Sequence, residues 1–387
     1  MAPTVQLTRG AIFRDESGWF NQTDFTYKTA FGGMQHEILF GAELGQQKRR
    51  VQSFSAPAFT TVPLFNSGRV VILAFTAAQV NADSAIPGNT VQDIFGFYLQ
   101  DQIALDKNWK ALAGVRFDKF QQSTRFDRKL APLSRTDNSF SPRAGLVWQP
   151  SESQSYYASY SRSFQQSAET FALAANNAAN APEITRNLEI GSKLDFLDGA
   201  SSVNAALFNL QRTNIKNTDP GNPNLSINAG TQRTNRLELS ANGRLPYRRD
   251  ISAVYSHLDG KMVQSLARIN TQQLPVMAVS ALGKVPSLTP HNSAFLWAMK
   301  TSDGGFKAGS GINYVSDRFT SLTNAVTVPA YLTADAAASY IARQYEVDVN
   351  LKNFFNKKYY VSSHGSVDKL IVSGAPRKLQ VALKYKF

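Results

Sequence analysis

Basic side chains recur singly along this chain, each in a segment where polar and apolar residues alternate. Such side chains attract anions, and several of them around one enclosed space would concentrate an anionic ligand. The chain carries 41 Lys and Arg against 28 Asp and Glu, a formal net charge of +13. Six cations on the polar side of alternating segments are the candidate ligand-guiding residues: Arg116, Arg143, Lys193, Arg236, Arg244 and Lys307.

Pairing with acidic residues is the alternative role for these cations. Asp118, Glu189, Asp195 and Glu238 fall on the polar sides of the same segments. Opposite charges on neighbouring strands stabilise a sheet, so cross-strand ion pairs would use the cations without any ligand. The sequence leaves both roles open.

Other kinds of chemistry find little support in the sequence. The four histidines, at 36, 257, 291 and 364, are not spaced as metal ligands, and there is no cysteine. No nucleophile elbow, glycine-rich phosphate loop or pair of catalytic carboxylates is recognisable. The basic residues form no patch or stripe of the kind that binds nucleic acid. We therefore expect a protein that is not an enzyme, has no cofactor and binds no nucleic acid.

The elements that carry the cations are predicted to be β-strands with one apolar and one polar side. Successive side chains of a strand point to opposite faces of a sheet. In residues 187–196 the two sides separate cleanly, and similar patterns recur at 236–244, 306–314 and 346–352. Leu188, Ile190, Leu194 and Phe196 oppose Asn187, Glu189, Gly191, Lys193 and Asp195. Strands with lipid on one side and water on the other are typical of a membrane barrel.

Two segments follow this pattern less well. In residues 91–105, Asp93 and Asp101 fall on the apolar side with Phe95 and Phe97. A charge facing lipid is costly near the midplane and tolerated near the interfaces, so both aspartates are expected at a rim or beside a bulge. Residues 202–212 are apolar on both sides and could not be oriented.

The connections between strands differ in length in a regular way. Tight turns are predicted at 106–108, 149–153, 197–200, 245–249 and 302–305. Long polar connections are predicted at roughly 47–90, 126–139, 165–184, 214–230, 261–289, 317–328 and 356–374. Short turns at one end and long loops at the other are typical of an outer-membrane barrel. The sequence therefore predicts an all-β fold, a transmembrane antiparallel β-barrel with about 15–16 strands.

The final strand keeps its two sides to the last residue. Leu379, Val381, Leu383, Tyr385 and Phe387 alternate with polar or small residues. In a barrel the last strand must pair at its edge and face lipid on one side. In a complete barrel it closes against the first strand, and for this chain we expect either an antiparallel barrel or an open, curved barrel wall.

At this point the sequence resembles the TonB-dependent siderophore receptors of the bacterial outer membrane. The resemblance runs through most of the chain and is strongest in GFYLQDQIALDKNWKALAGVRFDKF (96–120). It continues in SPRAGLVWQPSESQSYYASYSRSF (141–164), PEITRNLEIGSKLDFLDGASSVNAALFNLQRTNI (182–215), NLKNFFNKKYY (350–360) and GAPRKLQVALKYKF (374–387). Each segment alone is only weak evidence for the resemblance, but together the segments are specific for this family.

The resemblance implies a place in the bacterial outer membrane and uptake of ferric siderophores. In the intact family an inner-membrane TonB complex supplies the energy by pulling on a plug domain. The family barrel has about 22 strands, and a plug and a coupling box should precede it. Neither is recognisable in the sequence, so residues 1–387 are expected to be an N-terminally truncated receptor barrel. A plugless passive pore or a non-functional fragment is the alternative.

The resemblance also implies partners and candidate contacts. The barrel-assembly machinery is expected to recognise the last strand through Leu383, Tyr385 and Phe387, with outer-membrane lipid around the barrel. The iron arrives within the chelate, so no metal site of the protein is required. Aromatic residues of the long connections are candidates for an external chelate site, with packing among the loops as the alternative: Phe54, Phe59, Phe65, Phe171, Phe319 and Tyr331.

Overall fold

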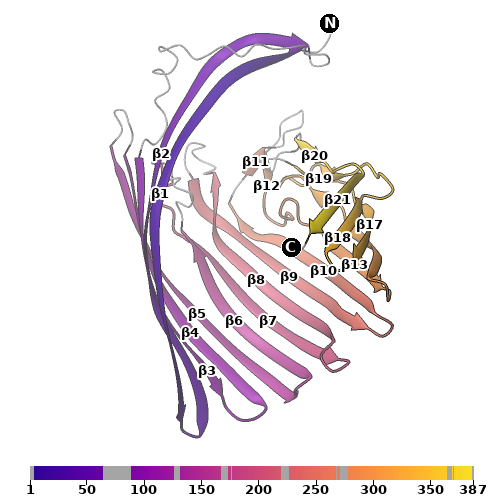
Figure 1. Ribbon diagram of the computed structural model, residues 1–387. Coiled ribbons are helices and arrows are strands. Elements are labelled where there is room, and N and C mark those ends of the chain that lie inside the picture. The colour runs from indigo at the N-terminus through magenta and orange to yellow at the C-terminus, as the bar shows by residue number, and fades with distance from the viewer. Residues whose placement is uncertain are drawn as a thin grey trace.

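Figure 1 shows the computed structural model of the chain, in which a tall sheet curves into a wall. The structure describes residues 4–63, 89–125, 131–166, 173–175, 177–218, 226–266, 268–270, 278–363, 368 and 370–385. Within them, 15 strands form one antiparallel sheet, as the alternation predicts. The strands in order are β1 (Thr4–Phe31), β2 (Met34–Pro63), β3 (Asn89–Ala104), β4 (Trp109–Arg125), β5 (Leu133–Ser151), β6 (Gln154–Gln165), β7 (Glu183–Phe196), β8 (Ser201–Thr218), β9 (Ser226–Leu245), β10 (Arg249–Ser265), β13 (Asn292–Thr301), β14 (Phe306–Val315), β17 (Tyr331–Ile341), β18 (Tyr345–Lys352) and β21 (Lys378–Tyr385).

Three small two-stranded sheets lie in the long connections. They pair β11 (Arg268–Asn270) with β12 (Ala278–Ser280), β15 (Arg318–Phe319) with β16 (Thr327–Val328), and β19 (Tyr360–Ser363) with β20 (Ile371–Ser373). Among the described residues, no helix has the length and apolar character needed to cross a membrane.

Short turns join the strands at one end of the wall. The β1–β2 turn has Gly32 at φ 59° and Gly33 at φ 80°, and a two-residue hairpin turn of this kind requires positive φ at both positions. The predicted tight turns fall at or beside the strand ends on this side. The long connections leave from the opposite end, which confirms the predicted asymmetry.

Several predicted connections prove to be partly strand, among them 214–230 and 261–289, and two of them illustrate the reason. The register of β2 with β1 continues to the Thr4–Pro63 pair, and β5 already begins at Leu133. In both cases the neighbouring strand is long enough to supply backbone partners. Pairing partners cannot be inferred from the periodicity of one segment. The predicted end of β2 is therefore too early, and the predicted start of β5 is too late.

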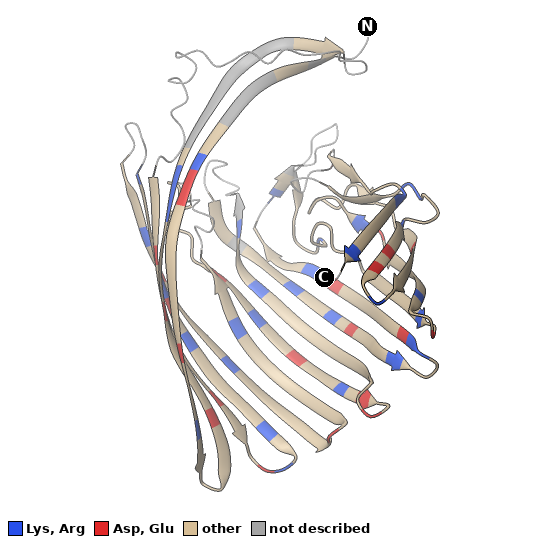
Figure 2. Ribbon diagram, in the orientation of Figure 1, with Lys and Arg blue, Asp and Glu red and all other residues tan. Residues whose placement is uncertain are grey.

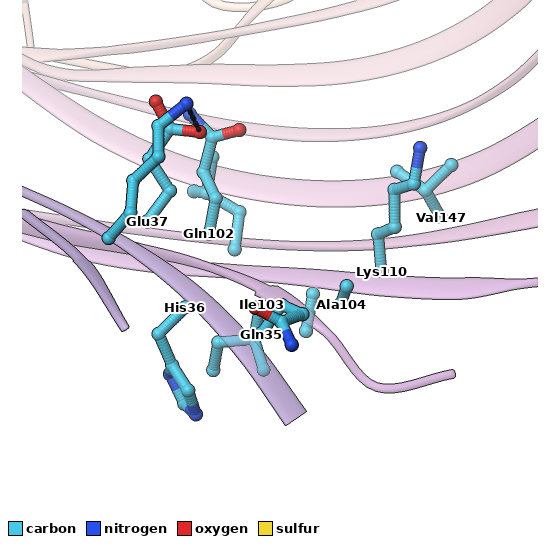
Figure 3. A pocket seen from close by; sticks show the side chains of 11 residues that line it. Gln35, His36, Glu37, Gln102, Ile103, Ala104, Lys110 and Val147 are labelled. Carbon is cyan, nitrogen blue, oxygen red and sulfur yellow. Dashed lines mark ion pairs between the residues drawn. The ribbon is translucent and has the colours of Figure 1, made fainter. Parts of the chain in front are cut away.

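Directly paired residues of neighbouring strands lie on the same face of the sheet. The register therefore identifies the residues of one face across many strands. Figure 2 shows the charged residues spread over many strands of the wall. In Figure 3, Glu37, Gln102 and Lys110 point toward the space that the strands enclose, and His36 points away. One row of paired residues extends this inner face from β2 to β10: Glu37, Gln102, Leu112, Gly145, Ser159, Glu189, Phe208, Arg236 and Leu258.

The outer face is apolar over a band that suits a membrane. Leu188 and Ile190 on β7 lie opposite the inner Glu189 and are 56% and 52% exposed, so lipid rather than protein must cover them. On β4 the outer residues are apolar from Trp109 to Phe117 and then change to Lys119. At about 3.3 Å per residue these positions extend about 26 Å along the strand, or about 20 Å along the membrane normal at a barrel's tilt, which fits within the apolar band of about 25 Å. The faces predicted for residues 187–196 agree with the register.

Aromatic rings line the outer face near the short turns. Trp148 lies between Trp109 and Tyr156, with ring centroids 6.2 and 5.4 Å away. Rings that are apolar on one side and polar at one end favour the boundary between lipid and headgroup. This cluster therefore marks one edge of the membrane band.

The two unusual aspartates of β3 lie on the outer face near the two ends of that strand. Asp93 accepts a hydrogen bond from Gln46 Nε2 at 2.8 Å, and Asp101 Oδ2 lies 2.7 Å from His36 Nδ1. The β3 register is regular on both sides. Asp93 pairs with Gln121, beyond the apolar band of β4, as the expected rim position requires, whereas Asp101 pairs with Ala113 within that band and has His36 as its partner. No bulge is involved.

Of the two expected forms, an antiparallel barrel or an open, curved wall, the described sheet takes the open form. Strand β21 pairs with β18 and strand β1 pairs with β2, and the sheet order places β1 and β21 at opposite edges. An odd number of alternating antiparallel strands leaves the first and last strand running in the same direction. An antiparallel pair between β1 and β21 therefore cannot form, whatever the curvature of the wall.

Candidate functional site

All six candidate cations lie on the inner face of the wall. The register and the alternation along each strand, which place Glu37 and Gln102 on the inner face, also place the six cations on it: Arg116, Arg143, Lys193, Arg236, Arg244 and Lys307. Their surroundings divide them into two groups, because some of them contact carboxylates and others do not.

Arg116 is held between two carboxylates. Its Nη2 lies 2.6 Å from Glu43 Oε2 on β2 and 2.6 Å from Asp118 Oδ1 on its own strand. Gly96 of β3 lies between Glu43 and Asp118 in the paired row, and the guanidinium extends over it. A Cβ at this position would collide with Arg116, so glycine is needed for a three-strand ion pair.

Arg236 and Arg244 are also paired. Arg236 forms an ion pair with Glu238 and donates a hydrogen bond to Ser256 Oγ at 3.1 Å. Arg244 Nε lies 3.4 Å from Asp250 Oδ1 in a pair that is mostly exposed. For these residues and Arg116, the ion-pair alternative describes the contacts seen.

Arg143, Lys193 and Lys307 form no ion pair with any residue that the structure describes. Arg143 and Lys193 line a common hollow of about 450 Å³ on the inner face of β5, β6 and β7. Tyr157 and Glu189 lie in the same hollow. The four residues define what we call the inner-wall site: Arg143, Tyr157, Glu189 and Lys193.

Tyr157 organises the inner-wall site. Its hydroxyl donates a hydrogen bond to Glu189 Oε1 at 2.7 Å, and Lys193 Nζ lies 6.0 Å from its ring centroid. The directly paired residue on β7 is Gly191, where a Cβ would lie 2.5 Å from Tyr157 Cζ. The ring therefore needs this glycine in order to lie against the sheet. With two cations and one carboxylate, the site has an excess of positive charge.

A second hollow of about 410 Å³ lies by the short turns. Figure 3 shows residues that line it, with the ion pair between Lys28 Nζ and Glu37 Oε2 at 3.5 Å. Lys110 Nζ, also in the lining, donates a hydrogen bond to Gln149 Oε1 at 2.9 Å. Its cations have polar partners, so this hollow is less suited to an anion than the inner-wall site.

The last two long connections are tied together by a buried arginine. Arg318, 5% exposed, donates hydrogen bonds to the carbonyls of Tyr360 at 3.1 Å and Val361 at 2.7 Å. Its guanidinium lies 5.4 Å from the ring centroid of Tyr331. The ring centroids of Tyr331 and Tyr359 are 4.6 Å apart. Burial lowers the pKa of this guanidinium.

A buried aspartate makes a second tie between these connections. Asp368 accepts hydrogen bonds from Thr320 Oγ1 and Ser321 Oγ, both at 2.7 Å.

Tyr331, a candidate for an external chelate site, packs against Arg318 and Tyr359. Phe319 lies in the same region on β15, whereas Phe65 and Phe171 lie outside the described residues, as do the side chains of Phe54 and Phe59.

The remaining sequence candidates have simple positions. Leu383 and Tyr385 lie on the outer face of β21 and are 71% and 55% exposed, and Phe387 lies outside the described residues. No cluster of three or more His, Asp or Glu among the described residues is arranged to hold a metal ion. Sequence reasoning missed Glu43, Gly96 and Tyr157, because cross-strand neighbours become visible only once the register is known.

Comparison with known proteins identifies the fold family. A family model described as TonB dependent receptor-like, beta-barrel, matches residues 3–354. The chain belongs to this family. TonB-dependent receptors are transporters of the bacterial outer membrane rather than enzymes, and they need no cofactor.

Curated relatives share a modest identity with this TonB-dependent receptor barrel. The metal-pseudopaline receptor CntO of Pseudomonas aeruginosa is 29% identical over 306 residues, covering 76% of this chain and 41% of the relative. The ferrichrome outer membrane transporter/phage receptor of Escherichia coli K12 is 24% identical, covering 98% of this chain and 50% of the relative. The chain thus spans about half the length of the relatives it matches.

Solved structures agree on the fold. The siderophore receptor PiuA from Acinetobacter baumannii superposes with a TM-score of 0.81 at 21% identity, covering 97% of this chain and 56% of that chain. The ferric-catecholate import receptor Fiu from E. coli K12 gives 0.80 at 18% identity, covering 97% and 55%. At this identity the likeness concerns the fold alone.

Proposed function

We propose that residues 1–387 form part of the barrel of an outer-membrane receptor that takes up ferric siderophores by energy-coupled transport. Family membership supports an outer-membrane transporter, and several relatives are named as siderophore receptors. The odd strand number and the partial coverage of the relatives support a segment of a larger barrel. The ferric chelate and the TonB-type complex are the partners that this function requires.

The inner-wall site is the observation that carries the ligand proposal. It contains two cations and a single carboxylate, which accepts its hydrogen bond from Tyr157, and it faces the space that the wall encloses. An excess positive charge in a lumen raises the local concentration of anions. An anionic ferric chelate is therefore the ligand class that this wall suits best.

Uptake of iron-loaded siderophores tests the proposed function. The gene that encodes this chain would be expressed in cells that lack their own siderophore receptors, and accumulation of radioactive iron would be followed for a panel of chelates. No plug domain or coupling box is recognisable in residues 1–387, so we expect this chain alone to restore no uptake that depends on the proton-motive force. The same residues joined behind the plug and first strands of a relative should give saturable uptake that stops when that force is dissipated. Uptake that rises linearly with concentration and ignores the proton-motive force would support the passive pore instead.

Removing the free cations should slow the uptake of anionic chelates selectively. With both Arg143→Gln and Lys193→Gln, we expect the uptake rate of an anionic chelate to fall about tenfold at low salt, within the range for electrostatic focusing. A neutral chelate should be affected little. The matched control is the charge-conserving pair Arg236→Gln with Glu238→Gln, which removes a cation that is already neutralised. Equal losses for both chelates would contradict the guiding role.

We also propose that the barrel-assembly machinery reads the end of the last strand. Leu379, Leu383 and Tyr385 present an exposed apolar face on β21, whose far edge has no partner strand in the sheet. An unpaired strand edge is a template for pairing with another chain. Phe387 continues the same alternation in the sequence.

Removal of the terminal aromatic ring tests this second proposal. We expect Phe387→Ala to reduce the amount of folded protein at the cell surface several-fold, whereas Tyr385→Ala, the control for a ring at the membrane boundary, should cost only a little stability. Surface labelling of cells would measure both. Normal surface levels of the Phe387 variant would show that the machinery does not depend on this residue.

A further inference from the structure

The two hollows on the inner face adjoin each other, because Leu112 and Val147 line both of them. The register explains this overlap. Leu112 of β4 pairs with Gly145 of β5, and the next inner pair toward the short turns is Lys110 with Val147. Figure 3 shows the Lys110 side chain beside Val147, directed into the space that the strands enclose. Lys110 therefore borders the inner-wall site, although it lies in the lining of the other hollow.

The surface between Lys110 and the inner-wall site is uncharged and open. Its centre is Gly145, where an added Cβ would meet nothing closer than the carbonyl oxygen of Ala158 at 3.7 Å. At Gly191, by contrast, the ring of Tyr157 lies against the backbone. A ligand can therefore reach the sheet itself at Gly145, between the charged side chains.

Three cations from three strands surround this open surface. Lys110 lies on β4, Arg143 on β5 and Lys193 on β7, and all three residues are exposed. Lys110 Nζ donates a hydrogen bond to the side-chain amide of Gln149, which carries no charge. Glu189 is the one carboxylate among the described residues that line the inner-wall hollow. Three positive charges thus lie around one negative charge.

The spacing of these cations favours a ligand with several separate charges. Neighbouring strands lie about 4.8 Å apart, and residues advance about 3.3 Å along a strand. Lys110 and Lys193 are three strands apart, which separates their backbones by about 14 Å. Arg143 lies four residues, or about 13 Å, along β5 from Val147, the direct partner of Lys110. A small monovalent anion can contact only one of these cations at a time, whereas a larger anion with charges several ångströms apart can contact two or three.

We propose that Lys110 belongs to one binding site with Arg143 and Lys193, and that this extended inner-wall site takes a multivalent anion whose charges are spread over its surface. The inference rests on the proposed function, because it specifies the anionic chelate that the lumen would guide. Coulomb attraction acts at each contact, so a multivalent chelate gains from every cation and a monovalent chelate from one. The site would then distinguish anionic chelates by the number and spacing of their charges.

Binding of two fluorescent anions to the 387-residue chain in non-ionic detergent micelles tests the proposal. The probes are pyrene tetrasulfonate, which carries charges all around a rigid ring system, and pyrene monosulfonate, and micelles without protein give the background. A unit charge about 4 Å away contributes about fivefold in affinity in water. Lys110→Gln should therefore weaken binding of the tetrasulfonate about fivefold and change that of the monosulfonate little. Lys110→Arg, which keeps the charge, should bind both probes like the unmodified chain.

Lys307→Gln is the matched control, because Lys307 is also an inner-face cation without an ion pair to a described residue but lies on β14, well along the sheet from β4 to β7. It should leave both affinities unchanged, and circular dichroism would confirm that each variant is folded. The proposal would be overturned by an unmodified chain that does not bind the tetrasulfonate, by an unchanged tetrasulfonate affinity in Lys110→Gln, or by equal losses in Lys110→Gln and Lys307→Gln. The measurement requires no energy coupling, so its result is independent of the uptake test.

Discussion

Ile190→Arg should destabilise the protein in a lipid bilayer by about 2–4 kcal/mol, the cost of an arginine facing lipid near the midplane of a barrel. Ile190 is 52% exposed on the outer face of β7. It lies midway between Phe196, near the short turns, and Arg186, at the upper boundary of the apolar band. Unfolding titrations in phospholipid vesicles would measure the change.

Lys193→Ser is the control for this substitution, because it removes a polar group from the inner face of the same strand. Its cost should be well below that of Ile190→Arg, since Lys193 is exposed to water and forms no ion pair with a described residue. Comparable losses in the two variants would mean that the two faces of β7 have been exchanged or that both are buried in protein.

Arg116→Gln should cost about 3 kcal/mol in free energy of unfolding. Its side chain contacts Glu43 and Asp118, whose side chains are only 16% and 5% exposed. Removing one partner of a buried ion pair leaves the others without compensation, which costs about 3–5 kcal/mol. The lower end of that range applies because the Arg116 side chain is 31% exposed.

Arg244→Gln is the matched control for Arg116→Gln. Arg244 also lies on the inner face and contacts one carboxylate, that of Asp250, but the two side chains are 75% and 45% exposed. Exposed ion pairs contribute about 0–1 kcal/mol. The free energy of unfolding of this variant should therefore be close to that of the unmodified protein. If Arg116→Gln proved as mild as Arg244→Gln, the three-strand ion pair would have no structural role.

The sequence predicted well those features that depend on one strand at a time. The sides of residues 187–196 follow from a period of two, and the turns at 197–200 and 302–305 follow from their Asp and Gly residues. The strand number and the asymmetry between the two ends follow from repeating this reasoning along the chain. The family resemblance, read from the same segments, is confirmed by the match over residues 3–354.

Features that depend on pairing between strands could not be predicted in this way. The role of Gly96 becomes clear only when Glu43 and Asp118 are known to be its neighbours in the sheet. The same holds for Tyr157 and Gly191 in the inner-wall site. The length of the β1–β2 hairpin is also a property of the register, and it departed from expectation. The register likewise decides for the open wall over the closed barrel.

The orientation of β7 is the central claim, and a scan of single cysteines tests it most directly. The chain contains no cysteine, so each position from 187 to 195 except Gly191, where a Cβ would collide with Tyr157, can carry one spin label without background. In a bilayer, labels at 188, 190 and 194 should be accessible to oxygen dissolved in lipid, and labels at 189, 193 and 195 to a water-soluble nickel complex. Accessibility that does not alternate with a period of two, or that alternates with the opposite phase, would contradict the account.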